Sequence, residues 1–447
     1  MDQQNNKNST TYKEYINKIA NTDDELFGQI KNELSRQKKY IQMIASENAT
    51  WPEVMLAQGS VLTNKYAEGY PEKRYYNGCG NVDQIEKIAM DRLRKLFKCE
   101  YVNVQPHSGT NANMAVLTAF LQPHDTLLGM SLDFGGHLTH GSKVSISGKF
   151  FNAQQYKARL SDHCLDYDAI LQQAREVKPK LIIAGCSAYP KLINWKRFRE
   201  IADDVGAILH CDIAHIAGLI AGGVIDSPME FADVVTATTH KTLKGPRGGI
   251  IMAKNMTYAK KLNSAVFPAT QGGPLMHVIA AKAVAFKKAS TQEFKNYTAQ
   301  IIKNAKAIEK AFKDNNIKMI GGGTECHLIL VDLSDKKISG AKACKLLEQA
   351  GIVANKNAIP FDKLGVTETS GIRFGSPYIT SMGMGEKEAY ELGVYISEII
   401  NIASDIENLQ NKQEIQEVKL QNIIKKIKVK TLELCHKFPI YNEDVLL

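Results

Sequence analysis

Residues 232–253 read ADVVTATTHKTLKGPRGGIIMA, in which two continuously apolar runs flank a polar loop rich in Thr, Lys and Gly. Similar Val-, Ile- and Leu-rich runs come earlier in the chain: YVNV, DTLLGM, KLIIAG and AILHCD. Helical patterns such as WKRFREIADDVG fill several of the gaps between them. Continuously apolar strands are buried on both faces, and strands that alternate with helices run parallel. The sequence therefore predicts an α/β fold whose large, mostly parallel sheet is flanked by helices.

The chain has 447 residues, about three times the length of a typical domain of about 150 residues. Its polar start, to about residue 20, is typical of a frayed tail, and an amphipathic helical pattern begins at Asp24. A helical region over 275–316 is followed by a second, smaller α/β pattern that starts with HLILVDL and ends in a helical stretch over 386–438. We expect an N-terminal tail and helical arm (1–49), a large domain (50–290) and a small C-terminal domain (291–447).

Composition narrows the class of protein. Hydrophobic residues at 44% and charged residues at 23% exclude disorder for most of the chain. No secretory signal is visible, and the longest apolar run, 216–225, is far short of the roughly 20 residues of a membrane span, which predicts a soluble protein. Eight cysteines without a Cys-x-x-Cys pair favour the reducing cytoplasm. The net charge of +9 permits anionic partners without selecting one.

Ligands of parallel sheets gather beyond the carboxyl ends of the strands, so residues that directly follow each apolar run are candidate site residues. Lys241 follows one run, where a lysine in a cleft can form an imine with a carbonyl group, although an isolated lysine is more often solvated in a surface turn. Asp212 closes AILHCD. A buried acid there needs a cation, such as the pyridinium nitrogen of pyridoxal phosphate, unless it only caps a helix.

Ser108, Gly109 and Thr110 lie between a strand and a helical pattern, where they predict either a phosphate cradle or a simple helix cap. We expect the aromatic ring of His137 to stack on a planar cofactor. We expect His140 only to pack against its neighbours, without a role in the site. Their three-residue spacing resembles a metal pair, but no further ligand clusters with them, so no metal site is expected. The order of phosphate loop, stacking ring, acid and lysine is the order that a pyridoxal phosphate site needs.

Nine long segments carry a resemblance to a known family. They are IASENATW (44–51), NKYAEGYPEKRYYNG (64–78), NVQPHSGTNAN (103–113), GGHLTHG (135–141), HCDIAHIAGLI (210–220), TATTHKTLKGPRGG (236–249), SAVFPATQGGP (264–274), ANKNAIP (354–360) and TSGIRFGSP (369–377). Through them the chain resembles serine hydroxymethyltransferases, which are fold-type-I pyridoxal phosphate enzymes with an aspartate-aminotransferase-like fold. The resemblance runs from about residue 24 to 441.

The resemblance implies the reversible conversion of serine and tetrahydrofolate to glycine and 5,10-methylenetetrahydrofolate. It implies a catalytic set of Lys241, Glu68, His240, Tyr76 and Thr238. It implies cofactor contacts from Ser108, Gly109, Thr110, His137, Ser187, Asp212, His215, Lys241, Tyr66, Gly272 and Gly273. Substrate contacts would come from Ser46, Glu68, Tyr75, Tyr76 and Arg373, and folate contacts from Leu132, Gly136 and Asn357.

By the same resemblance, Lys241 holds the cofactor as an imine and Asp212 pairs with its ring nitrogen. Arg373 would grip the substrate carboxylate, and Glu68 would be the proton-transferring acid. In this family the residues around Glu68 and Gly272 reach the site partly from a neighbouring subunit, so a homodimer is implied as the smallest catalytic unit. A tetramer is left open by His124, which resembles a residue at tetramer contacts.

Some positions depart from the family pattern. Thr110 stands where serine is usual, segment 361–368 diverges from the folate loop, and Tyr378 replaces a small residue close to Arg373. Two alternative functions are a folate-independent aldolase of the threonine aldolase type and a secondary role in binding RNA. The RNA-binding role is motivated by the net charge of +9 and by four lysines: Lys425, Lys426, Lys428 and Lys430. The solvated face of a helix is a simpler explanation of these lysines.

Overall fold

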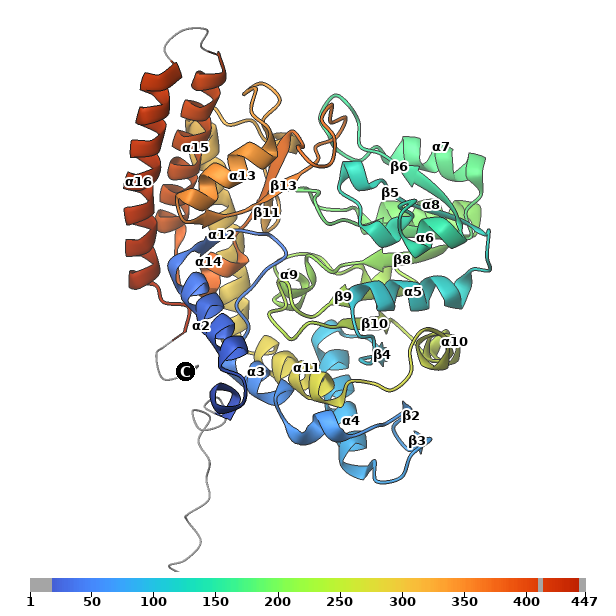
Figure 1. The fold of residues 1–447 in the computed structure, drawn as a ribbon. Coiled ribbons are helices and arrows are strands. Elements are labelled where there is room, and N and C mark those ends of the chain that lie inside the picture. The colour runs from blue at the N-terminus through green and yellow to red at the C-terminus, as the bar shows by residue number, and fades with distance from the viewer. Residues whose placement is uncertain (1–17, 409–412, 442–447) are drawn as a thin grey trace, which may run out of the picture.

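A computed structural model of the chain describes residues 18–408 and 413–441. A seven-stranded sheet and a three-stranded sheet lie beside each other, each with its own helices (Figure 1). The expected frayed tail falls mostly on residues 1–17, outside the described residues.

The large sheet confirms the predicted α/β class. Its strands are, in spatial order, β4 (Tyr101–Asn103), β10 (Gly249–Ala253), β9 (Val234–Thr238), β8 (Ile208–Asp212), β7 (Leu181–Gly185), β5 (Thr126–Met130) and β6 (Asn152–Tyr156). The five strands from β9 to β6 pair in parallel. Strand β10 runs antiparallel to both of its neighbours, so the sheet is mostly parallel, as predicted, and not purely parallel. The physical reason is that only the loop 239–248, with no crossover helix, joins β9 to β10.

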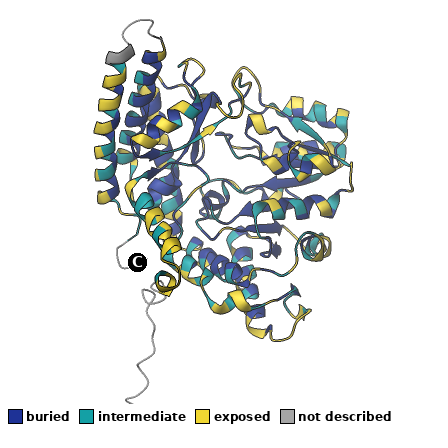
Figure 2. Ribbon diagram, in the orientation of Figure 1, coloured by how far each residue is buried: buried dark blue, intermediate teal, exposed yellow. Residues whose placement is uncertain are grey.

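Helices cover both faces of this sheet, which explains why its strands are mostly apolar, apart from the partly exposed edge strand β6. In β7, Leu181 and Ile183 pack in the cluster that contains α5 (Gly109–Phe120), whereas Ile182 and Ala184 pack in the cluster on the opposite face. That opposite face is covered by α4 (Gly80–Phe97), α7 (Tyr167–Val177), α8 (Trp195–Val205) and α11 (Met276–Ala289). The buried strands appear as a continuous dark blue layer in Figure 2.

The smaller sheet has the order β11 (Leu328–Asp332), β14 (Gly371–Gly375), β13 (Asn355–Asn357), and both pairings are antiparallel. It packs with α12 (Gln292–Asp314), α13 (Gly340–Gln349), α15 (Glu386–Asn408) and α16 (Gln413–Lys437). The short N-terminal strand β1 (Ile41–Gln42) joins this part of the fold by pairing with β12 (Ile352–Val353). The proposed boundary near residue 290 stays a prediction.

The two long helical regions are each divided in two. The region expected over 275–316 consists of α11 and α12, and Thr291 begins α12 by accepting the backbone N–H of Phe294 on its side chain. The region expected over 386–438 consists of α15 and α16. The N-terminal arm contains α2 (Asp24–Lys39), which Asp23 caps by accepting the N–H of Leu26 at 2.9 Å.

The remaining α-helices and β-strands are short. They are α3 (Pro52–Gln58), β2 (Gly69–Tyr70), β3 (Lys73–Arg74), α6 (Ile146–Phe150), α9 (Ala217–Ala221), α10 (Ala259–Ser264) and α14 (Pro377–Ser381). None of the described helices combines the length and apolar character that crossing a membrane requires. On α16, Lys425 and Lys426 are exposed while Ile424 and Ile427 are buried, as expected for the solvated face of a helix.

Candidate active site

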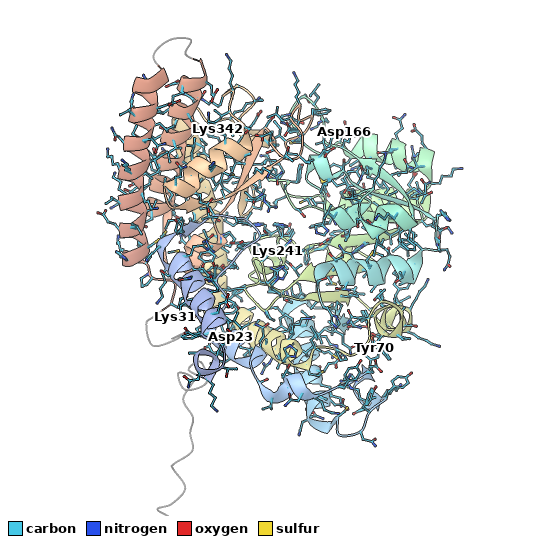
Figure 3. All side chains as sticks on the ribbon, in the orientation of Figure 1. Asp23, Lys31, Tyr70, Asp166, Lys241 and Lys342 are labelled. Carbon is cyan, nitrogen blue, oxygen red and sulfur yellow. The ribbon has the colours of Figure 1, made fainter. Side chains whose placement is uncertain are left out.

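A cavity of about 380 Å³ lies beyond the carboxyl ends of the parallel strands. Figure 3 labels Lys241 near the middle of the molecule, between the two sheets. Twelve of the residues predicted from the sequence line this cavity: Ser46, Ser108, Gly109, Thr110, His137, Ser187, Asp212, His215, Thr238, His240, Lys241 and Arg373. Glu47, Asn113, Ala214 and Arg247 complete its walls.

Lys241 is not in a solvated surface turn, because only 9% of the residue is exposed. Burial lowers the pKa of its amine to about 8, although the Asp212 carboxylate opposes that shift. The backbone around it is held in place, since Asn48 donates its side-chain amide to the Lys241 carbonyl at 2.9 Å. The structure therefore presents an amine that is partly unprotonated near neutral pH, as a nucleophile must be.

Asp212 is a buried carboxylate that accepts hydrogen bonds from a side-chain amide, an imidazole ring and a backbone N–H. Oδ2 accepts from the Asn113 amide at 2.8 Å and from Nε2 of His140 at 3.0 Å, and Oδ1 accepts the backbone N–H of Ala214 at 3.0 Å. Burial alone would raise the pKa of Asp212, but the hydrogen bonds from His140 and Asn113 hold it well below its usual range. Helix α9 begins five residues later without a side-chain cap, so the interpretation of Asp212 as a helix cap is wrong.

His140 has a defined place in this network, and our expectation that it is ordinary packing is wrong. Its Nδ1 accepts the backbone N–H of His137 at 3.2 Å, which leaves Nε2 as the protonated nitrogen that donates to Asp212. Among the described residues no group of three His, Cys or carboxylate side chains is placed to bind a metal ion. The three-residue spacing places the His137 backbone N–H on the His140 ring, and that ring contacts the carboxylate of Asp212.

His137 presents a neutral, flat ring to the cavity. Burial lowers the pKa of His137 to about 4. Its Nδ1 accepts from the backbone N–H and the hydroxyl of Thr139, at 3.2 and 2.7 Å, so the ring orientation is fixed. A neutral ring in a fixed orientation is suited to stacking on another planar group.

The loop of Ser108, Gly109 and Thr110 opens helix α5 and is built for close approach of backbone groups. Ser108 caps the helix and accepts the N–H of Asn111 at 3.2 Å. A Cβ atom on Gly109 would lie 2.6 Å from the Cγ2 atom of Thr238, and one on Gly249 would lie 2.2 Å from the Ser108 carbonyl oxygen. Free N–H groups at the start of a helix favour an anion, and Arg247 adds a positive charge to the same cavity.

Arg373 enters the cavity from the smaller sheet. It donates to the Ser187 carbonyl at 2.7 Å and to Oδ1 of Asn355 at 3.3 Å, and it lies 3.5 Å from the Ser46 hydroxyl. Arg373 is only 9% exposed, and no carboxylate within 18–408 and 413–441 forms an ion pair with it. Burial lowers the pKa of Arg373 to about 10, so the guanidinium remains a cation at neutral pH. A ligand carboxylate would supply the ion-pair partner that Arg373 lacks among the described residues.

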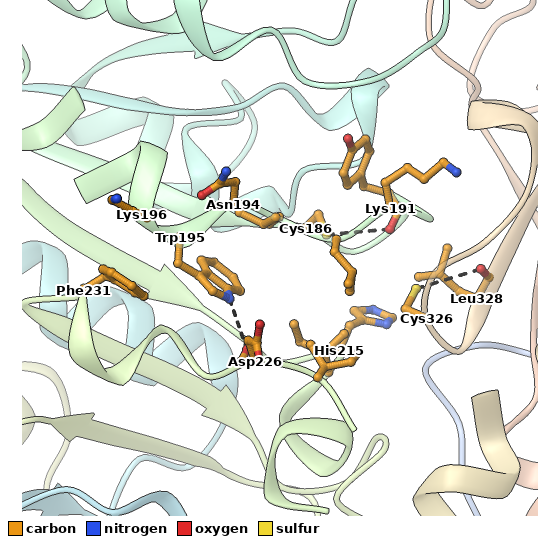
Figure 4. A pocket seen from close by; sticks show the side chains of 15 residues that line it. Cys186, Lys191, Asn194, Trp195, Lys196, His215, Asp226, Phe231, Cys326 and Leu328 are labelled. Carbon is orange, nitrogen blue, oxygen red and sulfur yellow. Dashed lines mark hydrogen bonds between the residues drawn. The ribbon is translucent and has the colours of Figure 1, made fainter. Parts of the chain in front are cut away.

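His215 forms the boundary between this cavity and a second cavity of about 420 Å³, drawn in Figure 4. Nδ1 of His215 lies 3.3 Å from Nε2 of His327, a buried residue that sequence reasoning missed. Burial, together with the nearby cations Lys241 and Arg373, holds the pKa of His215 well below its usual range. The Trp195 indole in the second cavity donates to the Asp226 carbonyl at 3.2 Å.

Thr238 and His240 flank the Lys241 loop. The Thr238 hydroxyl donates to the Ala214 carbonyl at 3.2 Å, which joins the end of β9 to the segment after β8. Burial lowers the pKa of His240 to about 3, so its ring is neutral.

A second group of predicted residues lies together but outside the Lys241 cavity. It comprises Tyr66, Glu68, Tyr75, Tyr76, Gly272 and Gly273. The Tyr66 hydroxyl lies 3.3 Å from Oε1 of Glu68, its ring packs at 5.1 Å from that of Tyr76, and a Cβ atom on Gly273 would lie 3.1 Å from the Tyr66 ring. Tyr66, Tyr75 and Tyr76 are 54%, 76% and 46% exposed. One chain alone therefore does not bring this group to Lys241.

The three positions matched to folate contacts also lie outside the cavity. Leu132 is 40% exposed, and Gly136 is packed so closely that a Cβ atom would lie 2.0 Å from the Met130 carbonyl oxygen. Asn357 is on β13 and donates to the Ala358 carbonyl at 2.7 Å. Near them the ring of Phe361, in the segment that departs from the family pattern, packs edge-to-face on Phe134 at 4.9 Å.

Sequence reasoning assigned no role in the site to five residues in or next to the cavity wall: Glu47, Asn113, His140, Arg247 and His327. Asn113 and Arg247 lie within quoted motifs, and the spacing of His140 drew attention to it. No local signal marks His327, because its contact with His215 joins positions 112 residues apart.

Comparisons with known proteins agree with this geometry. The family model described as serine hydroxymethyltransferase matches residues 19–396. A serine hydroxymethyltransferase of Nitrosospira multiformis is 53% identical over 425 residues, which cover 95% of this chain and 98% of the relative. Those of a Marinomonas species and of Orientia tsutsugamushi are 53% and 50% identical, over 95% and 93% of this chain and 97% and 99% of the relatives. The chain belongs to the serine hydroxymethyltransferase family.

Proposed function

We propose that this chain is a pyridoxal-phosphate-dependent serine hydroxymethyltransferase, which transfers a one-carbon unit reversibly between serine and tetrahydrofolate to give glycine and 5,10-methylenetetrahydrofolate. The observation that carries the proposal is the convergence, in one cavity, of an amine with a lowered pKa, an ionised buried acid and an unpaired guanidinium. Family membership and the names of the relatives support the same reaction.

The residues present fit the cofactor. Ser108, Gly109 and Thr110 line the cavity at the start of α5 together with Arg247, and no lysine or arginine forms an ion pair with Asp212 among the described residues. We propose that Ser108, Gly109 and Thr110 hold the phosphate. In the same proposal His137 stacks on the ring, Asp212 pairs with the ring nitrogen, and His215 and Ser187 contact the ring edge. Bound pyridoxal phosphate supplies an electron sink for the negative charge that develops at the substrate Cα.

The chain's own residues then orient and protonate the substrate. Arg373 binds the substrate carboxylate through two N–H groups and thereby fixes which Cα bond stands perpendicular to the cofactor ring. Ser46, 3.5 Å from Arg373, can take part in the same contact. The amine of Lys241 would hold the cofactor, and its lowered pKa would keep part of it unprotonated, as a nucleophile requires. In the same proposal Thr238 and His240, which line the cavity, lie against the cofactor beside Lys241.

We propose that the catalytic unit is a homodimer. The supporting observation is that one partly to fully exposed group lies outside the cavity of its own chain: Tyr66, Glu68, Tyr75, Tyr76, Gly272 and Gly273. On a neighbouring subunit the same group could supply Glu68 as the acid that moves a proton at the substrate hydroxyl. Among the described residues that line the cavity, the one carboxylate besides that of Asp212 belongs to Glu47, and burial raises the pKa of Glu47.

The folate substrate is assigned to the edge of the site near Leu132, Gly136 and Asn357. The net charge of +9 suits the anionic glutamate tail of folate. We propose a cytoplasmic location, which the eight free cysteines support. No described feature favours an RNA-binding role over a solvated helix face.

The decisive experiment compares serine cleavage by the purified protein with and without tetrahydrofolate. The proposal predicts strong stimulation by folate and formation of equal amounts of glycine and 5,10-methylenetetrahydrofolate. Cofactor-dependent cleavage of 3-hydroxy amino acids that folate does not stimulate would instead identify an aldolase.

A further inference from the structure

Lys282 is a buried lysine that the proposed reaction does not use. It lies in the middle of α11, where it is 1% exposed between Ala281 and Ala283, both of them buried. Its Nζ donates to the carbonyl oxygens of Val104 at 2.7 Å, Gly249 at 2.9 Å and Pro106 at 3.1 Å. An ammonium group has three N–H donors, so these three acceptors satisfy it completely.

The three acceptors belong to the segments that shape the Ser108–Thr110 loop. Val104 directly follows β4, Pro106 lies two residues before Ser108, and Gly249 begins β10. The Pro106–His107 peptide is held from both sides. Its carbonyl accepts from Lys282 and from the N–H of Gly249 at 3.0 Å, and its N–H donates to Oε1 of Gln271 at 3.2 Å.

Two glycines of the GPRGG motif are explained by this arrangement. A Cβ atom on Gly248 would lie 2.5 Å from Cε of Lys282, and one on Gly249 would lie 2.2 Å from the Ser108 carbonyl oxygen. The first glycine therefore makes room for the lysine, and the second makes room for the loop that the lysine supports.

A buried ammonium is costly to the fold unless its hydrogen bonds are complete. Burial lowers the pKa of Lys282 to about 7, and the Glu86 carboxylate opposes that shift. No carboxylate in the described part of the chain forms an ion pair with Lys282, so its interactions are concentrated on the backbone behind the loop.

We propose that Lys282 is a positioning residue that holds the phosphate loop from behind and thereby sets the affinity of the site for the phosphate group of its cofactor. The inference rests on the proposed pyridoxal phosphate site and assigns a role to a residue outside that site. Lys282 acts through the Pro106–His107 peptide, and groups that orient a binding loop must hold it within about 0.5 Å.

The test compares two probes that share the aldehyde and the ring but differ in the phosphate. Apo-protein is titrated with pyridoxal phosphate and with pyridoxal, and dissociation constants are read from the near-visible absorption. In Lys282→Met, we expect the dissociation constant for pyridoxal phosphate to rise about tenfold or more, as loss of an orienting partner does at metal sites. The constant for pyridoxal should change less than about twofold, because its binding needs no phosphate loop.

The matched control is Lys287→Met, which removes an exposed lysine from the same helix and should change neither constant. If Lys282→Met does not fold, Lys282→Gln, which retains an amide donor, carries the same comparison. Equal changes for the two probes, or no change, would overturn the role of Lys282. Failure of the wild-type protein to bind pyridoxal phosphate would instead overturn the proposed function.

Discussion

Nε2 of His140 lies 3.0 Å from Oδ2 of Asp212, and Nδ1 of the same ring accepts the backbone N–H of His137. One imidazole thus connects the residue proposed to stack on the cofactor ring with the residue proposed to pair with its nitrogen. Because the His137 N–H fixes the tautomer of His140, Asp212 always receives a hydrogen bond and remains ionised inside a fully buried site.

Replacement of His140 should therefore weaken cofactor binding through Asp212. In His140→Leu the carboxylate loses one donor, and the pKa of Asp212 rises toward its usual range. We expect the free energy of unfolding to fall by about 1.5–3 kcal/mol, the range for a buried hydrogen bond to a charged group, and the affinity for pyridoxal phosphate to fall as well. Denaturant unfolding and cofactor titration measure the two effects.

His140→Gln retains a side-chain N–H and should recover part of both losses. His436→Leu, which changes an exposed histidine of α16, is the control and should alter neither quantity. Cofactor affinity that is unchanged in His140→Leu would contradict the proposed link.

The lowered pKa of Lys241 predicts how cofactor uptake depends on pH. Only the unprotonated amine attacks an aldehyde, so the rate of reconstitution of the apo-protein should rise with pH and level off above about 8. A lysine of ordinary pKa, about 10.4, would give a rate that still rises at pH 10. Stopped-flow absorption measures this profile.

Asp212 raises the pKa of Lys241, so removing its charge should move the midpoint of the profile down. Asp212→Asn should thus reach its plateau at a lower pH than the wild-type protein, whatever its affinity for the cofactor. A midpoint that stays the same or moves up would exclude an electrostatic interaction between the two groups.

Arg373→Lys should raise KM for serine, because a point charge replaces two parallel N–H donors. A loss of about 1.5–3 kcal/mol in carboxylate binding corresponds to a rise of about 10- to 100-fold. Arg197→Lys, on the surface and paired with Asp168, is a control that should leave KM unchanged. Equal values of KM for Arg373→Lys and the wild-type protein would show that the substrate carboxylate binds elsewhere.

Subunit mixing tests whether the site is shared. Lys241→Ala and Glu68→Gln should each be nearly inactive as pure homodimers. Unfolding and refolding them together should give mixed dimers in which one of the two sites has both residues intact, which restores about a quarter of the wild-type activity. No recovery in a mixture shown to contain mixed dimers would mean that Lys241 and Glu68 act from the same chain.

Glu47 provides a discriminating comparison in the same assay, since it lines the cavity of its own chain. If Glu68 is the acid, Glu68→Gln should lose far more folate-dependent turnover than Glu47→Gln while both retain cofactor affinity. The reverse order would assign proton transfer to Glu47.

Much of the fold could be predicted because its signals are local. Buried strands such as 181–185 are apolar on both faces, and this pattern alone distinguishes a sheet covered twice from one that faces water. The direction of β10 could not be predicted from its own residues. It depends on the absence of a helix between Thr239 and Gly248. The glycines and the proline of this stretch are visible in the sequence, but its path depends on contacts with Lys282 and Ser108.

The candidate site divides in the same way. Lys241 and Asp212 could be found because a polar residue at the end of an apolar strand is a strong signal. His327 could not be found, because its partner His215 lies more than 100 residues away in the sequence. Lys282 could not be found, because its partners are three backbone carbonyl groups. Glu68 was found only through family resemblance, because its own chain places it outside the cavity.

The central claim is that Lys241 carries the cofactor, and the most direct test is chemical. The purified protein loaded with pyridoxal phosphate is reduced with borohydride and digested, and the modified peptide is identified by mass spectrometry. We expect a single reduced adduct on Lys241 and no adduct in Lys241→Ala. An adduct on another lysine, or one that persists in Lys241→Ala at wild-type yield, would contradict it.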